Sequence, residues 1–537
     1  MSMTNHSTGE AVSAPWRQIV RNTFLVAASF GLAALMGLLR NIIIARQFGI
    51  GADLDAYYAA FKLPDLLFTV VAGGALATAF IPVFSDVLAA QGRAAAWRLA
   101  SNITNMVLVA VALFSGLAAL LAPWLVHTFI APGFDAAQQQ ETANIMRIVL
   151  LSTLVFGISS VQGAVLNGFK HFLLPALAPV LYPVGIIVGA LWLSPSFGVR
   201  GLAMGAILGA ILHLTVKVPG LLHYGFSWQP AMNLRSPDVG RVAALMGPRI
   251  LDLAVFHLTL LVTTNLASRL QAGSVSALEW GWDAMQIPET LIGTAFGLVA
   301  FPTLADLAAR NDMTGFRHTF GETLRAILAF SVPATLGLIV LGRPMLTILY
   351  QRGAFDAAAT EAVYVALRFY ALGLIGHTCL ELAARAFFAQ QDTVTPLLVA
   401  TGSGVVNVIF ALILMRSLGH GGLALSNSLA ISAEVLVLLL ILRRRCRGID
   451  GLETLGALAR ILLATLVMGI ALEGALIAGQ MLALDTLWLV VGGAAIGAGV
   501  YVGAGLLLKL RILYQLRAAL MGRSDGSFLF PKIQAGE

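Results

Sequence analysis

The sequence predicts an all-α polytopic membrane protein of about fourteen transmembrane helices, arranged as two parallel six-helix lobes followed by two further helices. Of its 537 residues, 58% are hydrophobic and only 11% are charged. Soluble domains carry about a quarter charged residues, so this composition is typical of a protein that resides in a bilayer. The apolar segments have the length of helices rather than the alternating pattern of short strands, which argues against an outer-membrane barrel.

Successive apolar runs of about twenty residues define the individual spans. The segments from Met106 to Leu125 and from Leu173 to Leu193 are clear examples. Short connections that contain glycine and proline separate many of these runs. The predicted spans are 23–46, 56–86, 101–129, 143–167, 172–194, 200–225, 243–270, 277–305, 322–349, 359–389, 395–416, 421–442, 456–479 and 486–508.

Basic residues fall mainly on one side of the predicted membrane. With the N-terminus inside, the run from Arg443 to Arg447 and most other cations lie in cytoplasmic connections, while Arg200 and Arg352 are among the few opposite. This positive-inside pattern places both termini in the cytoplasm, although the basic run could instead bind anionic lipid. The first residues show no pattern of a cleavable signal peptide, so we expect the first apolar helix to act as the insertion signal.

An internal repeat divides the chain, because similar motifs recur about 221 residues apart. Asp306 in its motif follows Asp86 by 220 residues, and Asp356 follows Asp135 by 221. The offset covers six predicted helices. Because six is an even number, the two copies have the same orientation in the membrane. Such repeats indicate a transporter that binds its substrate between the two lobes. The predicted parts are a cytoplasmic segment 1–22, an N-lobe 23–225, a C-lobe 226–442, two helices 443–508 and a cytoplasmic tail 509–537.

No pattern of a catalytic, metal-binding or nucleotide-binding site stands out. The histidines are scattered, and the sequence contains neither HExxH, GxSxG nor a phosphate-binding loop ending in Lys-Ser or Lys-Thr. Cys379 and Cys446 suggest neither a disulfide nor a metal site. We therefore predict a transporter rather than an enzyme, with no cofactor and no metal. We also predict no nucleic-acid partner, because the positive-inside distribution of basic residues accounts for the net charge of +7.

Ionisable side chains inside apolar segments mark the candidate site, because such groups are costly in a bilayer and usually face a cavity or a partner. A guanidinium suits phosphate, so Arg40 is the first candidate for substrate contact, with a packing or interfacial role as the alternative. Lys62 precedes Pro64, which should kink the second helix, and could bind phosphate or pair with a nearby carboxylate. The candidate substrate-binding residues are Arg40, Lys62, Asp55 and Arg46, and Asp65 is a candidate for gating or ion coupling.

The eighth predicted span carries the corresponding charges of the second copy. Asp283 and Glu289 could form a cation or proton site, or a salt bridge between the lobes that opens during transport. Glu381 and Arg385 are spaced four residues apart on the tenth span, and we expect them to pair with each other.

Short motifs along most of the chain, in order, resemble the MurJ/MviN family of lipid II flippases within the multidrug/oligosaccharidyl-lipid/polysaccharide exporter superfamily. The resemblance implies fourteen helices, two lobes and alternating access, with Arg40 matching a central arginine of the family. It also implies that the cargo is lipid II, flipped between leaflets of a bacterial plasma membrane for cell-wall synthesis. The implied partners are this anionic lipid-linked substrate, membrane lipids and cell-wall synthesis enzymes. The motifs include Arg40-Asn, Ala45-Arg-Gln-Phe-Gly, Phe61-Lys-Leu-Pro-Asp-Leu-Leu, Leu166-Asn-Gly, Met246-Gly-Pro and Ala389-Gln-Gln-Asp-Thr.

The chain departs from the family pattern at several charged positions. Ala34 and Phe68 stand where the family has arginines, while Asn41 and Gln286 replace acidic residues. No sodium site is carried over. A small-molecule exporter of the same superfamily and a scaffold that has lost transport are the alternative functions.

Overall fold

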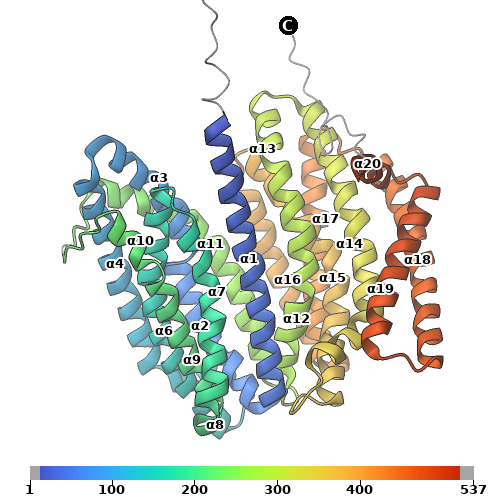
Figure 1. Cartoon of the computed structure of the whole chain (residues 1–537), viewed down its shortest axis with the longest axis horizontal. Coiled ribbons are helices and arrows are strands. Elements are labelled where there is room, and N and C mark those ends of the chain that lie inside the picture. The colour runs from blue at the N-terminus through green and yellow to red at the C-terminus, as the bar shows by residue number, and fades with distance from the viewer. Residues whose placement is uncertain (1–12, 231, 521–537) are drawn as a thin grey trace, which may run out of the picture. The chain divides into compact units, whose positions relative to one another are not determined.

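The computed structural model describes residues 13–230 and 232–520, which form helices joined by short connections and contain no strand within those ranges (Figure 1). Thirteen helical segments among them are long and apolar enough to cross a membrane. Helix α11 adds a further long helix, in which the apolar stretch Leu253–Ala267 is shorter. These segments correspond one to one with the fourteen predicted spans, so the predicted fold class is confirmed. The predicted segment 1–22 lies partly, and the tail 509–537 largely, outside the described residues.

The described residues form two compact units, one that ends at Arg269 and one that begins at Leu270. The first contains α1 (Ser13–Phe48), α2 (Ala52–Val71), α3 (Gly74–Gln91), α4 (Arg93–Leu120), α5 (Ala122–Leu125), η1 (Val126–Ile130), α6 (Ala136–Gly168), α7 (Leu173–Val188), η2 (Gly189–Leu193), α8 (Ser194–Phe197), α9 (Val199–Thr215), α10 (Val218–His223) and α11 (Pro237–Ala267). Helix α11 belongs to this unit because it packs against α2 and α3. The sequence repeat, with its boundary after residue 225, remains a prediction.

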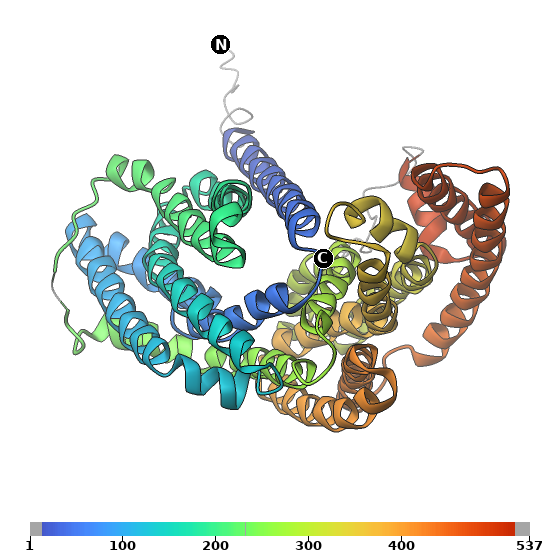
Figure 2. The same cartoon turned by 90° about the horizontal axis from the view of Figure 1, so that it is seen from below.

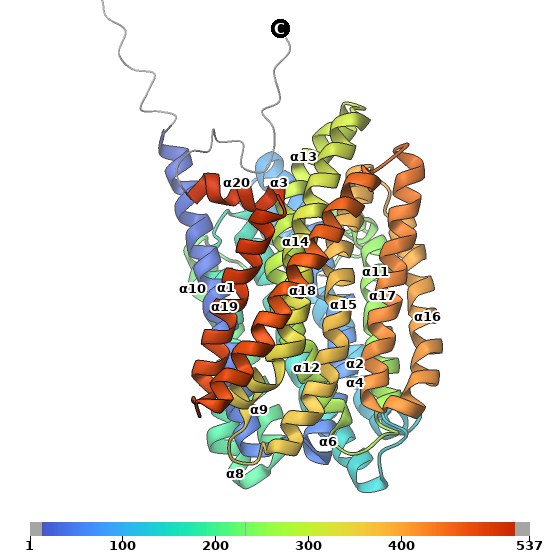
Figure 3. The same ribbon diagram turned by 90° about the vertical axis from the view of Figure 1, so that its right-hand side faces the viewer.

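The second unit contains α12 (Ser274–Glu289), η3 (Thr290–Thr294), α13 (Ala295–Ala309), α14 (Met313–Tyr350), α15 (Ala357–Ala389), α16 (Val394–Leu418), α17 (His420–Arg445), α18 (Gly451–Met481), α19 (Thr486–Leu507) and α20 (Arg511–Leu520). Helix α15 lies at the centre of its packing, against α12, α14 and α17. Helices α18 and α19 pack against each other and against α14, at one side of the unit in the end-on view (Figure 2). The short helix α20 lies across their ends (Figure 3).

Motifs of the repeat have the same structural role in both copies. Asp135 caps α6 by accepting a hydrogen bond from Gln138 N at 2.8 Å, and Asp356 caps α15 in the same way from Ala359 N at 2.8 Å. Such caps satisfy backbone N–H groups that a helix start leaves unpaired. Gly198 and Gly419 precede α9 and α17 with φ of 58° and 56°, in the left-handed region that favours glycine.

Close helix packing in the first unit depends on glycine. Helices α7 and α9 approach so closely that the backbones at Gly185 and Gly209 are in contact. Small residues allow this approach, which is a common basis of helix association in membranes. Helix α6 packs against both α2 and α9, and α1 packs chiefly against α7. Most side chains of α1 between Ala28 and Leu39 are exposed or half-exposed within the chain.

The second predicted span, 56–86, consists of two helices. Helix α2 continues through Pro64, and the chain breaks instead at Ala72 and Gly73, before α3 begins. In the second unit, the predicted span 277–305 is interrupted by the π-helical turn η3 just after Pro288. Gly293 in that turn follows Ala72 by 221 residues, one repeat length. The interruptions therefore occur at equivalent places in the two copies.

Candidate functional site

Arg40 lies on α1, inside the part of the helix that is long and apolar enough to cross a membrane. It comes eight residues before the end of α1 at Phe48, about 12 Å along the axis of a helix that must cross roughly 30 Å of hydrocarbon. Its guanidinium is half-buried, and Nε and Nη2 donate to Asn41 Oδ1 at 3.0 and 2.9 Å. Asn41 is itself buried, so the amide helps to fix the orientation of the cation without neutralising its charge.

Arg40 lies close to the first candidate residues of α2 and to α7. The charges of Arg40 and Asp65 both act on the buried hydroxyl groups of Tyr57 and Tyr182. Tyr57 and Asp65 belong to α2, and Tyr182 belongs to α7. Three helices of the first unit therefore bring one cation, one carboxylate and two phenols into the same neighbourhood.

The other predicted substrate contacts are more dispersed. Lys62 is half-buried and lies ten residues into α2, about 15 Å from its start, with its charge acting on His257 of α11. Asp55 is 1% exposed in the first turn of α2, where the helix dipole favours a carboxylate. Arg46 is exposed in the last turn of α1, well away from the depth of Arg40.

A hollow of about 160 Å³ lies beside this group of residues, between α2, α6 and α7. Among the residues that line the hollow, Asp65 is the one that its charge in an apolar segment marks as a candidate. The others are apolar, aromatic or small hydroxyl side chains, which are common in any membrane helix and carry no signal by themselves. The lining consists of Phe61, Asp65, Phe68, Val149, Ser152, Thr153, Phe156 and Tyr182.

The candidates of the second unit cluster around the end of α12. Glu289 is half-buried, accepts a hydrogen bond from Thr290 Oγ1 at 3.3 Å, and lies in the electrostatic field of Glu381 and Arg385 of α15. The predicted pairing of Glu381 with Arg385 is confirmed. Asp283 lies six residues earlier on α12 and is half-buried. Whether Glu289 and Asp283 bind an ion or open a salt bridge remains a prediction.

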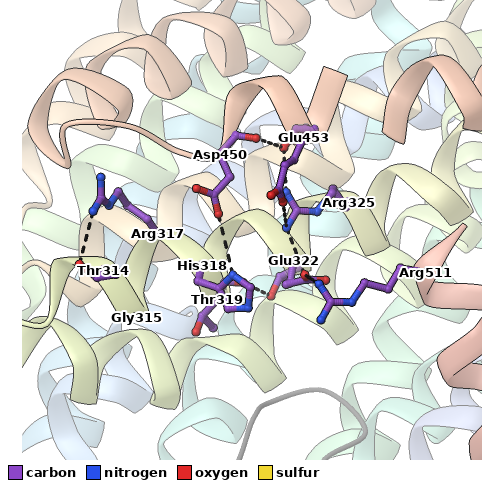
Figure 4. Close-up of polar contacts among 12 residues, drawn as sticks. Thr314, Gly315, Arg317, His318, Thr319, Glu322, Arg325, Asp450, Glu453 and Arg511 are labelled. Carbon is purple, nitrogen blue, oxygen red and sulfur yellow. Dashed lines mark hydrogen bonds and ion pairs between the residues drawn. The ribbon is translucent and has the colours of Figure 1, made fainter. Parts of the chain in front are cut away.

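A separate group of charges joins the start of α14 to α18 and α20 (Figure 4). Arg325 pairs with Glu322 at 3.2 Å and with Glu453 at 3.5 Å, while Arg511 of α20 pairs with Glu322 at 2.6 Å. The side chains in this network carry compensating charges. We therefore interpret it as an attachment of the two C-terminal elements to α14 rather than as an anion site.

A buried cation in the first unit was not identified from the sequence. Lys217 is 2% exposed, and its ammonium group donates to the backbone carbonyl of Ser159, whose hydroxyl lies 2.8 Å from His213 Nδ1. A lysine within the apolar run 199–223 could have been recognised by the same criterion that selected Arg40.

A family model described as "Lipid II flippase MurJ" matches residues 44–491. The chain belongs to the MurJ family. The resemblance inferred from short motifs is therefore confirmed, and the match includes α2, α6, α7 and α12, which supply most of the candidate residues.

Curated MurJ relatives cover most of the chain. The lipid II flippase MurJ of Burkholderia cenocepacia is 32% identical over 421 residues, 77% of this chain and 82% of that protein. The probable lipid II flippase MurJ of Vibrio cholerae is 28% identical over 530 residues, 94% of this chain and 98% of that protein.

Solved structures support the same fold. A lipid II flippase MurJ in an inward closed conformation matches with a TM-score of 0.76 and 22% identity, covering 93% of this chain and all of that one. An inward-facing MATE family multidrug transporter matches with a TM-score of 0.64 and 14% identity, covering 78% of this chain and 96% of that one. Together with the membrane-length helices, these matches identify a multi-pass membrane protein with the fold of MurJ and MATE transporters.

Proposed function

We propose that this protein flips lipid II, a polyprenyl-diphosphate-linked peptidoglycan precursor, from the inner to the outer leaflet by alternating access. Membership of the MurJ family along residues 44–491 is the observation that carries this proposal. The setting is the bacterial inner membrane, with both termini in the cytoplasm as the distribution of basic residues indicates. Cell-wall synthesis enzymes are the natural partners for the supply and use of the cargo.

Arg40 is the residue we assign to the diphosphate. Its guanidinium offers several N–H donors in a planar fork, stays charged when desolvated, and lies near mid-depth of the bilayer on α1. Asn41 Oδ1 accepts hydrogen bonds from Nε and Nη2 of Arg40, which helps to hold the guanidinium in a fixed orientation on α1. Lys62, at a similar depth on α2, would add a second cation, and Asp55 and Arg46 would contribute nearer the helix ends.

Asp283, Glu289 and Asp65 remain our candidates for gating or ion coupling. Glu289 and the Glu381–Arg385 pair place two carboxylates and one guanidinium in a single neighbourhood of the second unit. A group with one carboxylate in excess can attract a cation or a proton, which supports a coupling role.

Complementation of a bacterial strain depleted of its lipid II flippase tests the proposal. We expect the wild-type chain to restore growth and Arg40→Ala to fail. Loss of charge-assisted hydrogen bonds to phosphate removes about 1.5–3 kcal/mol, or about ten- to a hundred-fold in affinity. Arg40→Lys should restore growth partly, because it keeps the charge but loses the fork. Arg416→Ala, which removes an exposed arginine from the last turn of α16, is the matched control and should behave as wild type.

Two outcomes would contradict parts of this assignment. Full rescue by Arg40→Ala would remove Arg40 from the mechanism while leaving the flippase function intact. Failure of the wild-type chain, despite normal amounts in the membrane, would contradict the function itself. A drug-efflux assay on the same strain would then decide between a small-molecule exporter and a protein without transport.

A further inference from the structure

The imidazole of His257 lies inside an apolar stretch of α11 and lacks a hydrogen-bonding partner among the described residues. His257 belongs to the stretch Leu253–Ala267, and its side chain is half-buried. The ring packs edge-on against Phe256 at 5.6 Å between centroids, but no described residue forms a hydrogen bond or an ion pair with it. An ionisable group in such a position usually faces a cavity or a partner rather than lipid. His257 is therefore a candidate for contact with a ligand.

Hydrogen bonds place the end of α11 and the start of α2 at the same level. Gly133 N, in the connection between η1 and α6, donates to Ser268 Oγ, directly after α11, at 3.1 Å. Gln138 Nε2, in the first turn of α6, donates to the carbonyl of Ala52, the first residue of α2, at 2.9 Å. Depths measured from these two helix ends can therefore be compared.

His257 and Lys62 share one depth in the first unit. His257 lies ten residues before the end of α11, and Lys62 lies ten residues after the start of α2, so each is about 15 Å from its helix end. Helices α2 and α11 pack against each other, and the charge of Lys62 acts on the imidazole. Arg40 lies about 12 Å from the end of α1 that leads into α2. Basic groups of three helices therefore occupy a similar level of the bilayer.

The electrostatic field of the described residues at His257 is that of a cation. Among the described charged groups, Lys62 is the one whose charge acts on the imidazole, and no carboxylate does. This holds whatever else Lys62 contacts. A ligand that lies against His257 is therefore favoured if it is an anion. The other ionisable residues of α11 and of the helices packed against it are Asp238, Arg241, Arg249 and Asp252 on α11, Asp53, Asp55, Tyr57, Tyr58, Lys62 and Asp65 on α2, Asp86 on α3, Arg93 and Arg98 on α4, and His127 in η1.

Protonation of His257 and binding of an anion favour each other. The protonated ring carries N–H donors at both nitrogens and a positive charge, so it can form charge-assisted hydrogen bonds with phosphate oxygens. Without an anion, that charge is repelled by Lys62, and an anion beside both groups offsets the repulsion. Because such linkage is reciprocal, an anion that binds more tightly to the protonated ring also draws a proton onto it.

We propose that His257 is a further contact for the diphosphate of the cargo lipid and binds it as the imidazolium, so that a proton is taken up with the lipid. This inference rests on the proposed function. The proton passes from water onto the ring when the lipid binds, and it returns to water when the lipid leaves. One ring N–H donates to a phosphate oxygen, while Lys62 adds its charge at the same depth. The diphosphate is the strongly anionic part of that cargo, and so it is the group expected at this level.

Binding of lipid II as a function of pH tests this contact. The purified full-length protein in detergent is titrated with lipid II between about pH 5.5 and 8.5, a range that spans the ordinary imidazole pKa of about 6.5. The diphosphate of lipid II is esterified at both ends and does not titrate in this range. The affinity of the wild type should fall as the pH rises, by at most about ten-fold per pH unit, which is the limit for uptake of one proton.

Two substitutions at the same position separate charge from shape. His257→Gln should weaken binding at the acidic end about ten-fold, as expected when a hydrogen bond between charged groups is lost, and its affinity should no longer depend on pH in the way of the wild type. His257→Arg keeps a cation at every pH, so it should retain the affinity of the wild type at the acidic end and lose the fall in affinity towards the basic end. Calorimetry in two buffers of different ionisation enthalpy should show proton uptake near neutral pH for the wild type and less for both variants.

Controls separate this contact from folding and from the function as a whole. His223→Gln makes the same substitution at an exposed position on α10 and should keep the pH profile of the wild type. The shape of the profile does not depend on the fraction of protein that is folded. A flat wild-type profile, or one that His257→Gln leaves unchanged, would overturn the contact. An equal response that depends on His257 with phosphatidylglycerol in place of lipid II would overturn its assignment to the cargo. A wild-type protein that binds lipid II at no pH would instead contradict the proposed function.

Discussion

Replacing Gly185 by alanine should destabilise the first unit through the contact between α7 and α9. A Cβ atom added at Gly185 would lie 2.1 Å from the backbone nitrogen of Gly209 and 2.3 Å from its Cα. Ordinary contacts of a Cβ begin near 3.4 Å, so the two helices would have to separate locally by about 1.3 Å. The obstacle is backbone, which cannot rotate away as a side chain would. Overpacking of this kind costs about 1–3 kcal/mol, and relaxation of two long helices should place the cost at the upper end.

The comparison with Gly116→Ala makes this prediction specific. Gly116 lies in α4 with no atom within 4 Å of the position of its Cβ, so alanine adds no clash there and gains up to about 1 kcal/mol of helix propensity. Thermal unfolding of the purified proteins in one detergent, followed by circular dichroism and by size-exclusion chromatography, provides the measurement. Gly185→Ala should lower the melting temperature by several degrees, and Gly116→Ala should leave it unchanged or raise it. Equal melting temperatures for the two variants would refute the argument from backbone contact.

Three further predictions concern the ends of the membrane helices and the connections between them. Glu322→Gln should weaken the attachment of α20 to α14, which limited proteolysis should detect as faster cleavage near the C-terminus. Burial alone would raise the pKa of Asp392, but hydrogen bonds from Thr395 and the ion pair with Arg445 outweigh it and lower the pKa to about 2. The ionised carboxylate of Asp392 therefore stabilises the fold at pH values above its ordinary pKa of 3.8. This stabilisation is lost as the pH falls through about 2. Solvent screening keeps it under about 1 kcal/mol. Asp392→Asn should make the melting temperature less dependent on pH in that interval. Burial raises the pKa of Cys446, so its alkylation by N-ethylmaleimide at pH 7 should be slow in the folded protein and rapid in denaturant.

Each of these three has an outcome that contradicts it. Unchanged cleavage of Glu322→Gln would mean that apolar contacts alone hold α20. An unaltered acid profile of Asp392→Asn would mean that its ion pair is too well solvated to matter. Rapid alkylation of Cys446 in the folded protein would show that the end of α17 opens readily.

Local sequence was sufficient to predict the membrane fold. Each span is a continuous apolar run, and hydrocarbon leaves helices as the only economical structure for such a segment. The predicted repeat is supported by Asp135 and Asp356, which lie one repeat length apart and cap α6 and α15 in the same way. The interruption at Ala72 and Gly73 could not be predicted from the presence of Pro64. A transmembrane helix tolerates proline where neighbouring groups satisfy the backbone carbonyl that proline leaves without a donor.

The candidate site was less predictable than the fold. Charges in apolar surroundings are conspicuous in a sequence, so Arg40 and Asp65 were identified before their neighbours were known. Phe156 and Tyr182 reach the same place from helices far away along the chain, and nothing in their local sequence distinguishes them from packing residues. Depth also separates residues that sequence groups together: Arg46 is only six positions from Arg40, yet it is exposed in the last turn of α1.

The attachment of α1 along one edge has a mechanical consequence. Because α7 is the chief neighbour of α1, helix α1 is held in place mainly by one line of contacts. A change in the tilt of α1 would therefore move Arg40 while disturbing mainly the contacts between α1 and α7. A covalent staple between α1 and α7 would immobilise the cation while leaving the remaining architecture intact.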